Sequence, residues 1–276
     1  MTHAGWFICL VLFSLPLAAQ TPGAFVPPAD QDTAATTPAE LRRAEPPPAD
    51  WTPEQLEARG DELRAEKFFA DSIDYYRAAL TRMKQRSTAV LYNKMGMSEL
   101  QMLRYDRAKK NFEKAIKLDP KYGQALNNLG VVYYMRKSYG RAVKYYTRAI
   151  QVLPEWASFH SNLGTAYFAR KQYEKATAAY LRALELDPDV FERRSSTASV
   201  SAHMASPADR ARYAYVIARM YAHIGDTERS LLNLRKAMEQ GYKDIGDVYK
   251  DEEFVTIRKD PRFTELMTAP PPAIPN

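Results

Sequence analysis

Three consecutive segments of the chain carry nearly the same pattern: AVLYNKMGMSELQMLRYDRAKKNFEKAIKLDP at residues 89–120, KYGQALNNLGVVYYMRKSYGRAVKYYTRAIQVLP at residues 121–154, and EWASFHSNLGTAYFARKQYEKATAAYLRALELDP at residues 155–188. Each segment ends in a proline, and Pro120, Pro154 and Pro188 follow one another at steps of 34 residues. A proline ends a helix because it lacks an amide hydrogen and its ring clashes with the preceding turn. A fixed step of 34 residues therefore indicates one structural unit repeated along the chain.

Small and aromatic residues keep the same step inside each segment. The aligned columns are Gly96, Gly130 and Gly164; Ala108, Ala142 and Ala176; Phe112, Tyr146 and Tyr180; and Ala115, Ala149 and Ala183. Small residues allow two helix backbones to approach each other, and larger side chains fill the space around them. Each segment is therefore predicted to be a hairpin of two antiparallel helices.

The 34-residue period and the aligned columns of small and aromatic residues resemble those of the tetratricopeptide repeat family. The resemblance implies an all-α fold: a right-handed superhelical solenoid of about five hairpin units, followed by a C-terminal capping helical segment. In such a stack the first helices line a concave side and the second helices a convex side. The resemblance also implies binding, because this repeat mostly presents surfaces to other molecules.

The first 20 residues have the pattern of a signal peptide. An apolar run at residues 6–17 is about half as long as a membrane-spanning helix, and Ala18, Ala19 and Gln20 follow it. We expect cleavage near residues 19–21, a periplasmic or secreted protein, and no transmembrane span in the mature chain. An uncleaved anchor is the alternative. Cleavage would remove Cys9, the single cysteine, and with it any disulfide or thiolate site.

Residues 21–50 hold seven prolines and are predicted to form an extended, disordered linker. Four repeat units are expected over residues 51–194. The first begins with Thr52, Pro53 and Gln55, which provide a capping hydroxyl, a proline at the first helical position and a capping amide. The second unit begins 36 residues after Pro53, which predicts a longer second helix in the first unit.

The pattern breaks after Pro188. A serine-rich loop is expected at residues 195–206, a fifth unit at residues 207–241, a capping segment at residues 242–268 and a flexible tail at residues 269–276. The capping segment is predicted to contain two short amphipathic helices. Their apolar anchors are Phe254 with Ile257 and Phe263 with Leu266.

No catalytic pattern is found. The sequence has no glycine-rich phosphate loop, no histidine pair at ligand spacing on one helix, and no serine or cysteine elbow. His160 falls in a packing column, aligned with Tyr92 and Leu126. We therefore expect no catalytic residue, no metal site and no cofactor.

Positive charge is concentrated in the central repeats. Residues 82–148 hold 16 Lys and Arg against 4 Asp and Glu, a net charge of +12, whereas the whole chain has +6. A stripe on the second helices, predicted to face outward, consists of Arg107, Lys110, Lys114, Arg141, Lys144 and Arg148. It is either a solvated face or a docking surface for an anionic partner. Nucleic acid is an unlikely partner, because the aromatic residues of these helices occupy packing positions.

The first helices are expected to line a peptide-binding groove formed by Asn93, Lys94, Asn127, Asn128, Tyr134, Asn162, Thr165 and Phe168. Some family members clamp a carboxylate with two lysines, an arginine and two asparagines, but here Lys94 is the lone cation, so such a clamp is not expected. A neutral, amide-rich and aromatic groove suits the backbone of an extended peptide or a partner helix. The alternative is that the asparagines bond neighbouring helices.

The sequence thus predicts a non-catalytic protein-protein interaction scaffold in the periplasm or outside the cell. The alternative is an envelope-associated protein that binds an anionic polymer, a lipid or an acidic protein through its basic convex face.

Overall fold

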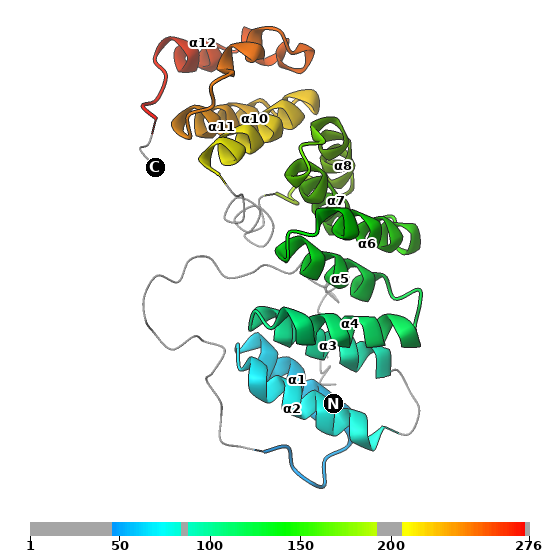
Figure 1. Ribbon diagram of the computed structural model, residues 1–276. Coiled ribbons are helices and arrows are strands. Elements are labelled where there is room, and N and C mark those ends of the chain that lie inside the picture. Colours follow the sequence, from blue (N-terminus) through cyan, green and yellow to red (C-terminus); the bar gives the residue numbers. More distant parts are fainter. Residues whose placement is uncertain (1–45, 84–87, 192–205, 274–276) are drawn as a thin grey trace, which may run out of the picture.

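The computed structural model describes residues 46–83, 88–191 and 206–273. All regular structure within these ranges is helical, and ten of the helices pair into five hairpins, or units. The hairpins are α1 (Pro53–Ala65) with α2 (Phe69–Arg82), α3 (Thr88–Gln101) with α4 (Tyr105–Leu118), α5 (Gly123–Met135) with α6 (Tyr139–Val152), α7 (Ala157–Ala169) with α8 (Tyr173–Leu186), and α10 (Pro207–His223) with α11 (Thr227–Glu239). They stack in chain order (Figure 1). The all-α hairpin stack predicted from the 34-residue period is confirmed.

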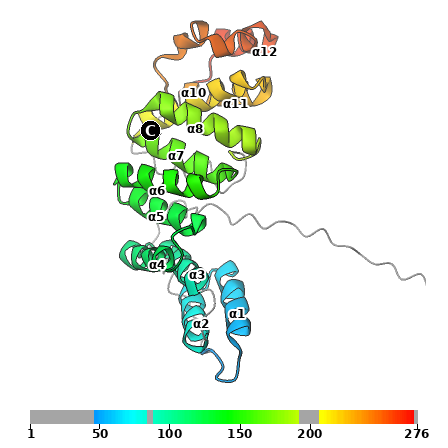
Figure 2. The ribbon, with the colours of Figure 1, turned by 90° about the vertical axis from the view of Figure 1, so that its right-hand side faces the viewer.

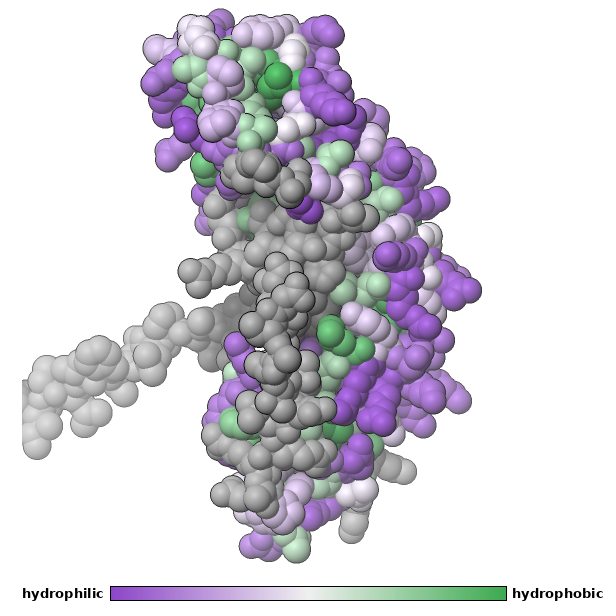
Figure 3. Space-filling view, turned by 60° about the vertical axis from the view of Figure 1, so that its left-hand side comes forward, coloured by the Kyte–Doolittle hydropathy of each residue, from purple (hydrophilic) through white to green (hydrophobic). Residues whose placement is uncertain are grey.

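The stack has an inner and an outer side. The second helix of each of the first three units packs on the first helix of the next, and first helices also touch one another, α3 with α5 and α5 with α7. The first helices therefore lie on the inner side of the curve, and the second helices lie on the outer side. α1 and α12 remain at opposite ends when the view is turned by 90° (Figure 2). Hydrophilic residues gather along one long edge of the molecule (Figure 3).

The small and aromatic columns hold each hairpin together. A Cβ atom at Gly130 would lie 2.6 Å from the ring of Tyr146, and one at Gly96 would lie 2.5 Å from the ring of Phe112. The same pairs recur as Gly60 with Tyr76 and Gly164 with Tyr180. Only glycine lets these rings pass so close to the first helix, which explains why the glycine and aromatic columns share one register.

The turn inside the hairpins is also repeated. In each of the five units, one residue of this turn lies in the left-handed region of φ. In the first four units these residues are Lys67, Leu103, Lys137 and Lys171, with φ between 56° and 67°, and in the fifth unit the residue is Gly225. In the third unit the Lys137 amide donates to the Tyr134 carbonyl and the Ser138 amide to the Tyr133 carbonyl, both at 2.8 Å. This arrangement satisfies the last carbonyls of the first helix.

The first unit begins as predicted. The Thr52 hydroxyl accepts a hydrogen bond from the Gln55 amide, and the Gln55 side chain accepts one from the Thr52 amide. The prediction of a longer second helix is wrong, because α2 has 14 residues, as have α4, α6 and α8. One of the two additional residues falls between α2 and α3, and the other lies in α3, which has 14 residues where α1, α5 and α7 have 13.

The fifth unit packs on the fourth although 20 residues separate α8 from α10. Phe191 and Tyr213 each meet the Tyr180 ring edge-on, with centroids 5.5 and 5.9 Å apart. An ion pair of 2.8 Å joins Arg229 to Asp189. The Ser206 hydroxyl accepts a hydrogen bond from the Asp209 amide and so caps the N-terminus of α10. The last residue of the loop predicted at residues 195–206 is therefore the N-cap of this helix.

The C-terminal segment covers the last hairpin with three short 3₁₀ helices, η2 (Ile245–Tyr249), η3 (Glu252–Phe254) and η4 (Ile257–Lys259), and with α12 (Pro261–Thr268). The four predicted anchors are buried: Phe254, Ile257, Phe263 and Leu266. The first of the two predicted helices is wrong, because η3 and η4 take its place. A segment this short gains too few α-helical hydrogen bonds to offset nucleation, so tighter turns form instead.

Several predicted segments lie outside the described residues. They are the signal peptide at residues 1–20, the linker up to residue 45, residues 195–205 of the serine-rich loop, and residues 274–276 of the tail. Among the helices that the structure describes, none is long and apolar enough to cross a membrane.

Candidate functional site

The predicted groove residues lie on the inner helices. Asn93 and Lys94 belong to α3, Asn127, Asn128 and Tyr134 to α5, and Asn162, Thr165 and Phe168 to α7. These residues do not form one uniform surface. The groove divides into an ionic part at the first two units, an amide part across the second to fourth units, and an aromatic part at the third to fifth units.

The amide part is a ladder of asparagines that bond one another. The Asn162 amide donates to Asn127 at 2.9 Å, and the Asn128 amide donates to Asn93 at 3.0 Å. A 3.4 Å bond from Asn127 to Asn128 joins the two pairs, and a further 3.4 Å bond links Asn93 to the Tyr122 hydroxyl. The ladder therefore connects α3, α5 and α7. Bonding of neighbouring helices is the alternative role that the sequence analysis left open for these asparagines.

The ladder leaves one asparagine partly accessible. Asn93, Asn127 and Asn128 are buried, with 2–5% of their surface exposed, whereas Asn162 is half-buried. A side-chain amide offers two donors and two acceptor positions, of which Asn162 uses one donor within the described residues. Asn162 is therefore the asparagine best placed to contact a ligand.

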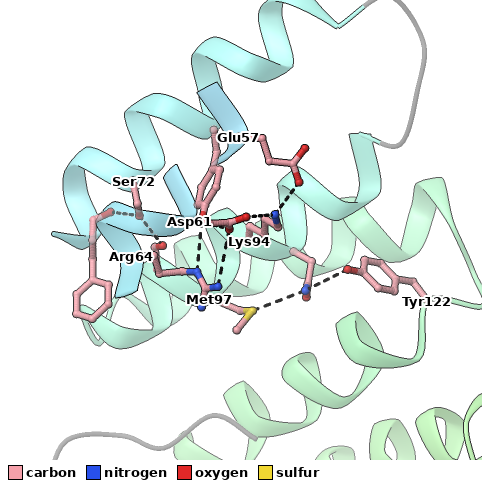
Figure 4. A network of polar contacts seen from close by, with 11 residues as sticks. Glu57, Asp61, Arg64, Ser72, Lys94, Met97 and Tyr122 are labelled. Carbon is pink, nitrogen blue, oxygen red and sulfur yellow. Dashed lines mark hydrogen bonds and ion pairs between the residues drawn. The ribbon is translucent and has the colours of Figure 1, made fainter. Parts of the chain in front are cut away.

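The ionic part neutralises Lys94. Its ammonium lies 2.6 Å from both Glu57 and Asp61 (Figure 4). Asp61 also accepts a hydrogen bond of 2.8 Å from the Tyr76 hydroxyl, and burial, together with the negative charge of Asp61, raises the pKa of Tyr76. With two carboxylates around one ammonium, Lys94 has no unpaired charge for a ligand carboxylate, which agrees with the expectation that no carboxylate clamp forms.

The aromatic part begins at Tyr134, which is half-buried and packs on Tyr139 with centroids 5.3 Å apart. Phe168 is buried and meets the rings of Tyr173 and Tyr213 edge-on, at 5.3 and 5.6 Å. Of the two residues predicted as apolar walls of the groove, Tyr134 is therefore partly exposed, whereas Phe168 belongs to the core between the fourth and fifth units and does not line the groove.

Sequence reasoning missed the buried tyrosine side chains that reach the inner helices from the second helices. The Tyr180 ring passes Gly164 and its hydroxyl donates to Thr165 on α7 at 3.3 Å, while Thr165 donates to the Ser161 carbonyl. Tyr146 passes Gly130 in the same way. The sequence offered one signal for these hydroxyls. Tyr146 and Tyr180 share a column with Phe112, whose ring fills the same packing position without a hydroxyl.

The predicted outer stripe lies on α4 and α6, as expected. Five of its six cations are exposed, and the sixth, Arg148, is half-buried. Along the described chain no carboxylate lies within 4.0 Å of any of them. In the fourth unit the stripe ends, because Arg182 pairs with Glu155 at 3.5 Å and with Glu185 at 3.0 Å.

Tyrosine rings hold several stripe cations in place. Tyr133 and Tyr145 stack with centroids 5.3 Å apart. Arg141 covers the first ring at 5.6 Å, and Arg148 covers the second at 5.4 Å. A guanidinium held over a ring keeps its N–H donors free at its edges, because it needs no carboxylate partner to be ordered.

Other candidate chemistry is sparse. No group of three or more His, Cys, Asp or Glu within residues 46–83, 88–191 and 206–273 could hold a metal ion. The imidazole Nε2 of His160 lies 2.8 Å from the Pro154 carbonyl, a contact that ties α7 to the preceding turn. This is a structural role, as its packing column suggested.

Two models of the tetratricopeptide repeat match the chain, one over residues 93–154 and one over residues 157–190. A search of curated proteins gives no match. Among solved structures, MamA from Desulfovibrio magneticus RS-1 is similar, with 20% identity, coverage of 68% of this chain and 94% of that chain, and a TM-score of 0.48.

Two further solved structures are similar at a comparable level. For a thermophilic TPR protein of Thermus thermophilus the identity is 17%, the coverage 79% of this chain and 100% of that chain, and the TM-score 0.47. For the first TPR of Spaghetti, bound to an HSP90 peptide, the identity is 26%, the coverage 43% and 94%, and the TM-score 0.37. None of these similarities identifies a partner for this chain. The 34-residue period, the five hairpins and the two matching family models make this chain a tetratricopeptide repeat protein.

Proposed function

We propose that this protein is a non-catalytic interaction scaffold, which binds an extended peptide or a helix of a partner protein on the inner face of its third and fourth units. The observation that carries the proposal is the mixture of groups on this face. Tyr134 offers a partly exposed ring, and Asn162 keeps an amide oxygen and one N–H for a peptide backbone. Neutral hydrogen bonds and aromatic contacts of this kind suit a main chain better than a charged ligand.

The proposal is tested by affinity capture from an envelope extract. The full chain, a Tyr134→Ala variant and a matched outer variant, Lys144→Ala, are immobilised in parallel, and bound proteins are identified by mass spectrometry. We expect one partner to be retained by the chain and by Lys144→Ala and to be lost from Tyr134→Ala, because truncating a central aromatic contact costs roughly 2 kcal/mol or more. Equal retention by all three would contradict binding on the inner face.

We also propose that the protein acts in the periplasm or outside the cell. The support is the apolar run at residues 6–17 followed by Ala18, Ala19 and Gln20. N-terminal sequencing of the exported protein should begin near Gln20 or Thr21. A product that retains Met1 would favour the uncleaved anchor.

A second candidate function is the binding of an anionic envelope polymer, a lipid or an acidic protein by the outer stripe. It is favoured by cations that lie over tyrosine rings with no carboxylate partner among the described residues. Binding of this kind should weaken steeply as the salt concentration rises to physiological values, whereas binding on the inner face should change little. Titration of heparin, as a probe polyanion, at two salt concentrations distinguishes them.

A further inference from the structure

Like charges stand side by side on the outer stripe. On α4 they are Arg107, Lys110 and Lys114, and on α6 they are Arg141, Lys144 and Arg148. Residues three or four positions apart are neighbours on a helix surface, and like charges at this spacing destabilise the helix. No carboxylate among the described residues lies within 4.0 Å of these six cations, so the fold leaves the repulsion uncompensated.

The flanking units avoid this arrangement in the same three columns. In the first unit the columns hold Asp71, Asp74 and Ala78, and in the fourth unit they hold Lys175, Ala178 and Arg182. Asp74 pairs with Arg77 at 2.9 Å, and Arg182 pairs with Glu155 and Glu185. Among the second helices that the structure describes, only α4 and α6 carry three cations in these columns. Solubility alone does not require such a cluster, because a surface of mixed charge serves it as well.

Tyrosine rings fix the positions of three of the six cations. Measured to the ring centroid, the distances are 5.6 Å for Lys114 over Tyr92, 5.6 Å for Arg141 over Tyr133 and 5.4 Å for Arg148 over Tyr145. Tyr133 is buried and stacks on Tyr145, so the two arginines rest on a rigid base. Side chains that are ordered in advance lose little conformational entropy when a ligand binds.

The stripe offers a ligand charge and little else. No large apolar side chain is exposed along α6, and beside α4 only Leu103 and Leu118 are exposed, one at each end of the helix. Helices that lie on a membrane insert an apolar face as well as cations, and single-stranded nucleic acid stacks its bases on open rings. Here Tyr133 is buried and Arg148 covers Tyr145. The ligand of the stripe is therefore held through its anionic groups.

We infer that the outer stripe binds an acidic polypeptide segment of a partner protein, which it holds in an extended form through Asp and Glu side chains. The inference rests on the second candidate function and names the partner of the stripe. Side chains on one face of an extended chain recur at roughly 6.7 Å, close to the roughly 5–6 Å between neighbouring positions along each row of cations. A carboxylate also fits the guanidinium fork with two parallel hydrogen bonds.

The test is calorimetric titration of the full chain with a synthetic peptide of about twelve residues in which Glu and Ser alternate, at one low salt concentration. The stripe variant is Lys110→Gln/Lys144→Gln, which removes two exposed cations. The matched control is Arg235→Gln/Lys236→Gln, which removes the same charge from exposed positions of α11, another second helix.

The peptide should bind the parent chain and the control with affinities within about twofold of each other. It should bind the stripe variant about tenfold more weakly, because two ion pairs are lost. A peptide with Gln in place of Glu should bind none of the three proteins. Without peptide, the stripe variant should unfold at no lower a urea concentration than the parent chain, since it removes like-charge neighbours.

Heparin and phosphatidylglycerol vesicles are titrated in parallel. The inference is overturned if the Glu-Ser peptide does not bind, if the stripe variant and the control bind it equally, or if the stripe variant loses stability without peptide. Stripe-dependent binding of heparin alone or of the vesicles alone would also overturn it, but the second candidate function would stand with that ligand. Failure of all three ligands would remove that function too. None of these results changes the outcome of the capture experiment on the inner face.

Discussion

At the scale of single residues, the asparagines of the inner helices act as internal ties. Asn128 donates to Asn93 and accepts from Asn127, and all three are buried. In Asn128→Ala an acceptor on Asn93 and a donor on Asn127 lose their partner, so the free energy of unfolding should fall by about 1–3 kcal/mol. Urea melts measure this loss, with Lys144→Ala, expected within about 0.5 kcal/mol of the parent chain, as the control.

A different outcome would indicate that the asparagines bind the ligand and do not stabilise the fold. If Asn128→Ala melts like Lys144→Ala and instead loses the captured partner, the amide ladder is dispensable for the fold and its groups contact the ligand directly.

Glu99 is the residue whose charge state should affect stability. It is buried on α3, with its carboxylate 3.8 Å from the Arg104 guanidinium. Burial raises its pKa, and the neighbouring arginines, Arg104 first, oppose the shift. A carboxyl with a raised folded pKa binds more protons in the folded state, so its contribution is most favourable below the unfolded pKa and becomes less favourable as pH rises toward the folded pKa.

Glu99→Gln removes this titration. Relative to the parent chain, the variant should therefore gain free energy of unfolding as the pH rises from about 4, near the ordinary pKa of a glutamate, to pH 7. Urea melts at the two pH values measure the difference. A variant that instead loses relative stability at pH 7 would mean that the arginine charges outweigh burial.

At the scale of elements, the contact between glycine and aromatic ring determines the hairpin. A larger side chain at position 130 would meet the Tyr146 ring, since even a Cβ atom would lie 2.6 Å away. Gly130→Leu should therefore overpack the interface and lower the free energy of unfolding by about 1–3 kcal/mol or more. Comparable urea melts for Gly130→Leu and Lys144→Ala would mean that the inner and outer faces are misassigned.

The repeated columns made the hairpins predictable, because one backbone geometry demands a small residue and a ring at fixed offsets. The capping box at Thr52 was predictable for the same reason, since its three residues are adjacent in sequence. The uniform length of α2 and the 3₁₀ turns before α12 were not, because they depend on where the chain leaves one unit and meets the next.

Side-chain partners were the least predictable part of the site. The residues Lys94, Asn128 and Asn162 share one column, yet Lys94 pairs with two carboxylates, Asn128 is buried and Asn162 is half-buried. The partners and burial of these three side chains depend on which groups the preceding unit places next to them. Tyr213 packs against Phe168 and Tyr180 only because the fifth unit packs on the fourth beyond the insertion, a contact that no periodicity could reveal.

At the scale of the whole molecule, the stack separates two kinds of chemistry. The inner helices carry amides and the partly exposed Tyr134 ring, while the outer helices α4 and α6 carry cations ordered by tyrosines. A partner held by the inner face therefore contacts neutral groups, and a partner held by the outer face contacts charge. The two modes respond differently to the same pair of variants.

Calorimetric titration of the captured partner tests the central claim, that the inner face is the binding surface. It compares the parent chain with a Tyr134→Ala/Asn162→Ala variant of the inner face and a Lys110→Glu/Lys144→Glu variant of the outer stripe. The account predicts that the inner variant binds weaker by roughly 2 kcal/mol, about thirtyfold, and that the outer variant stays within about 0.5 kcal/mol of the parent chain. Unchanged affinity of the inner variant, with binding lost in the outer variant, would contradict it.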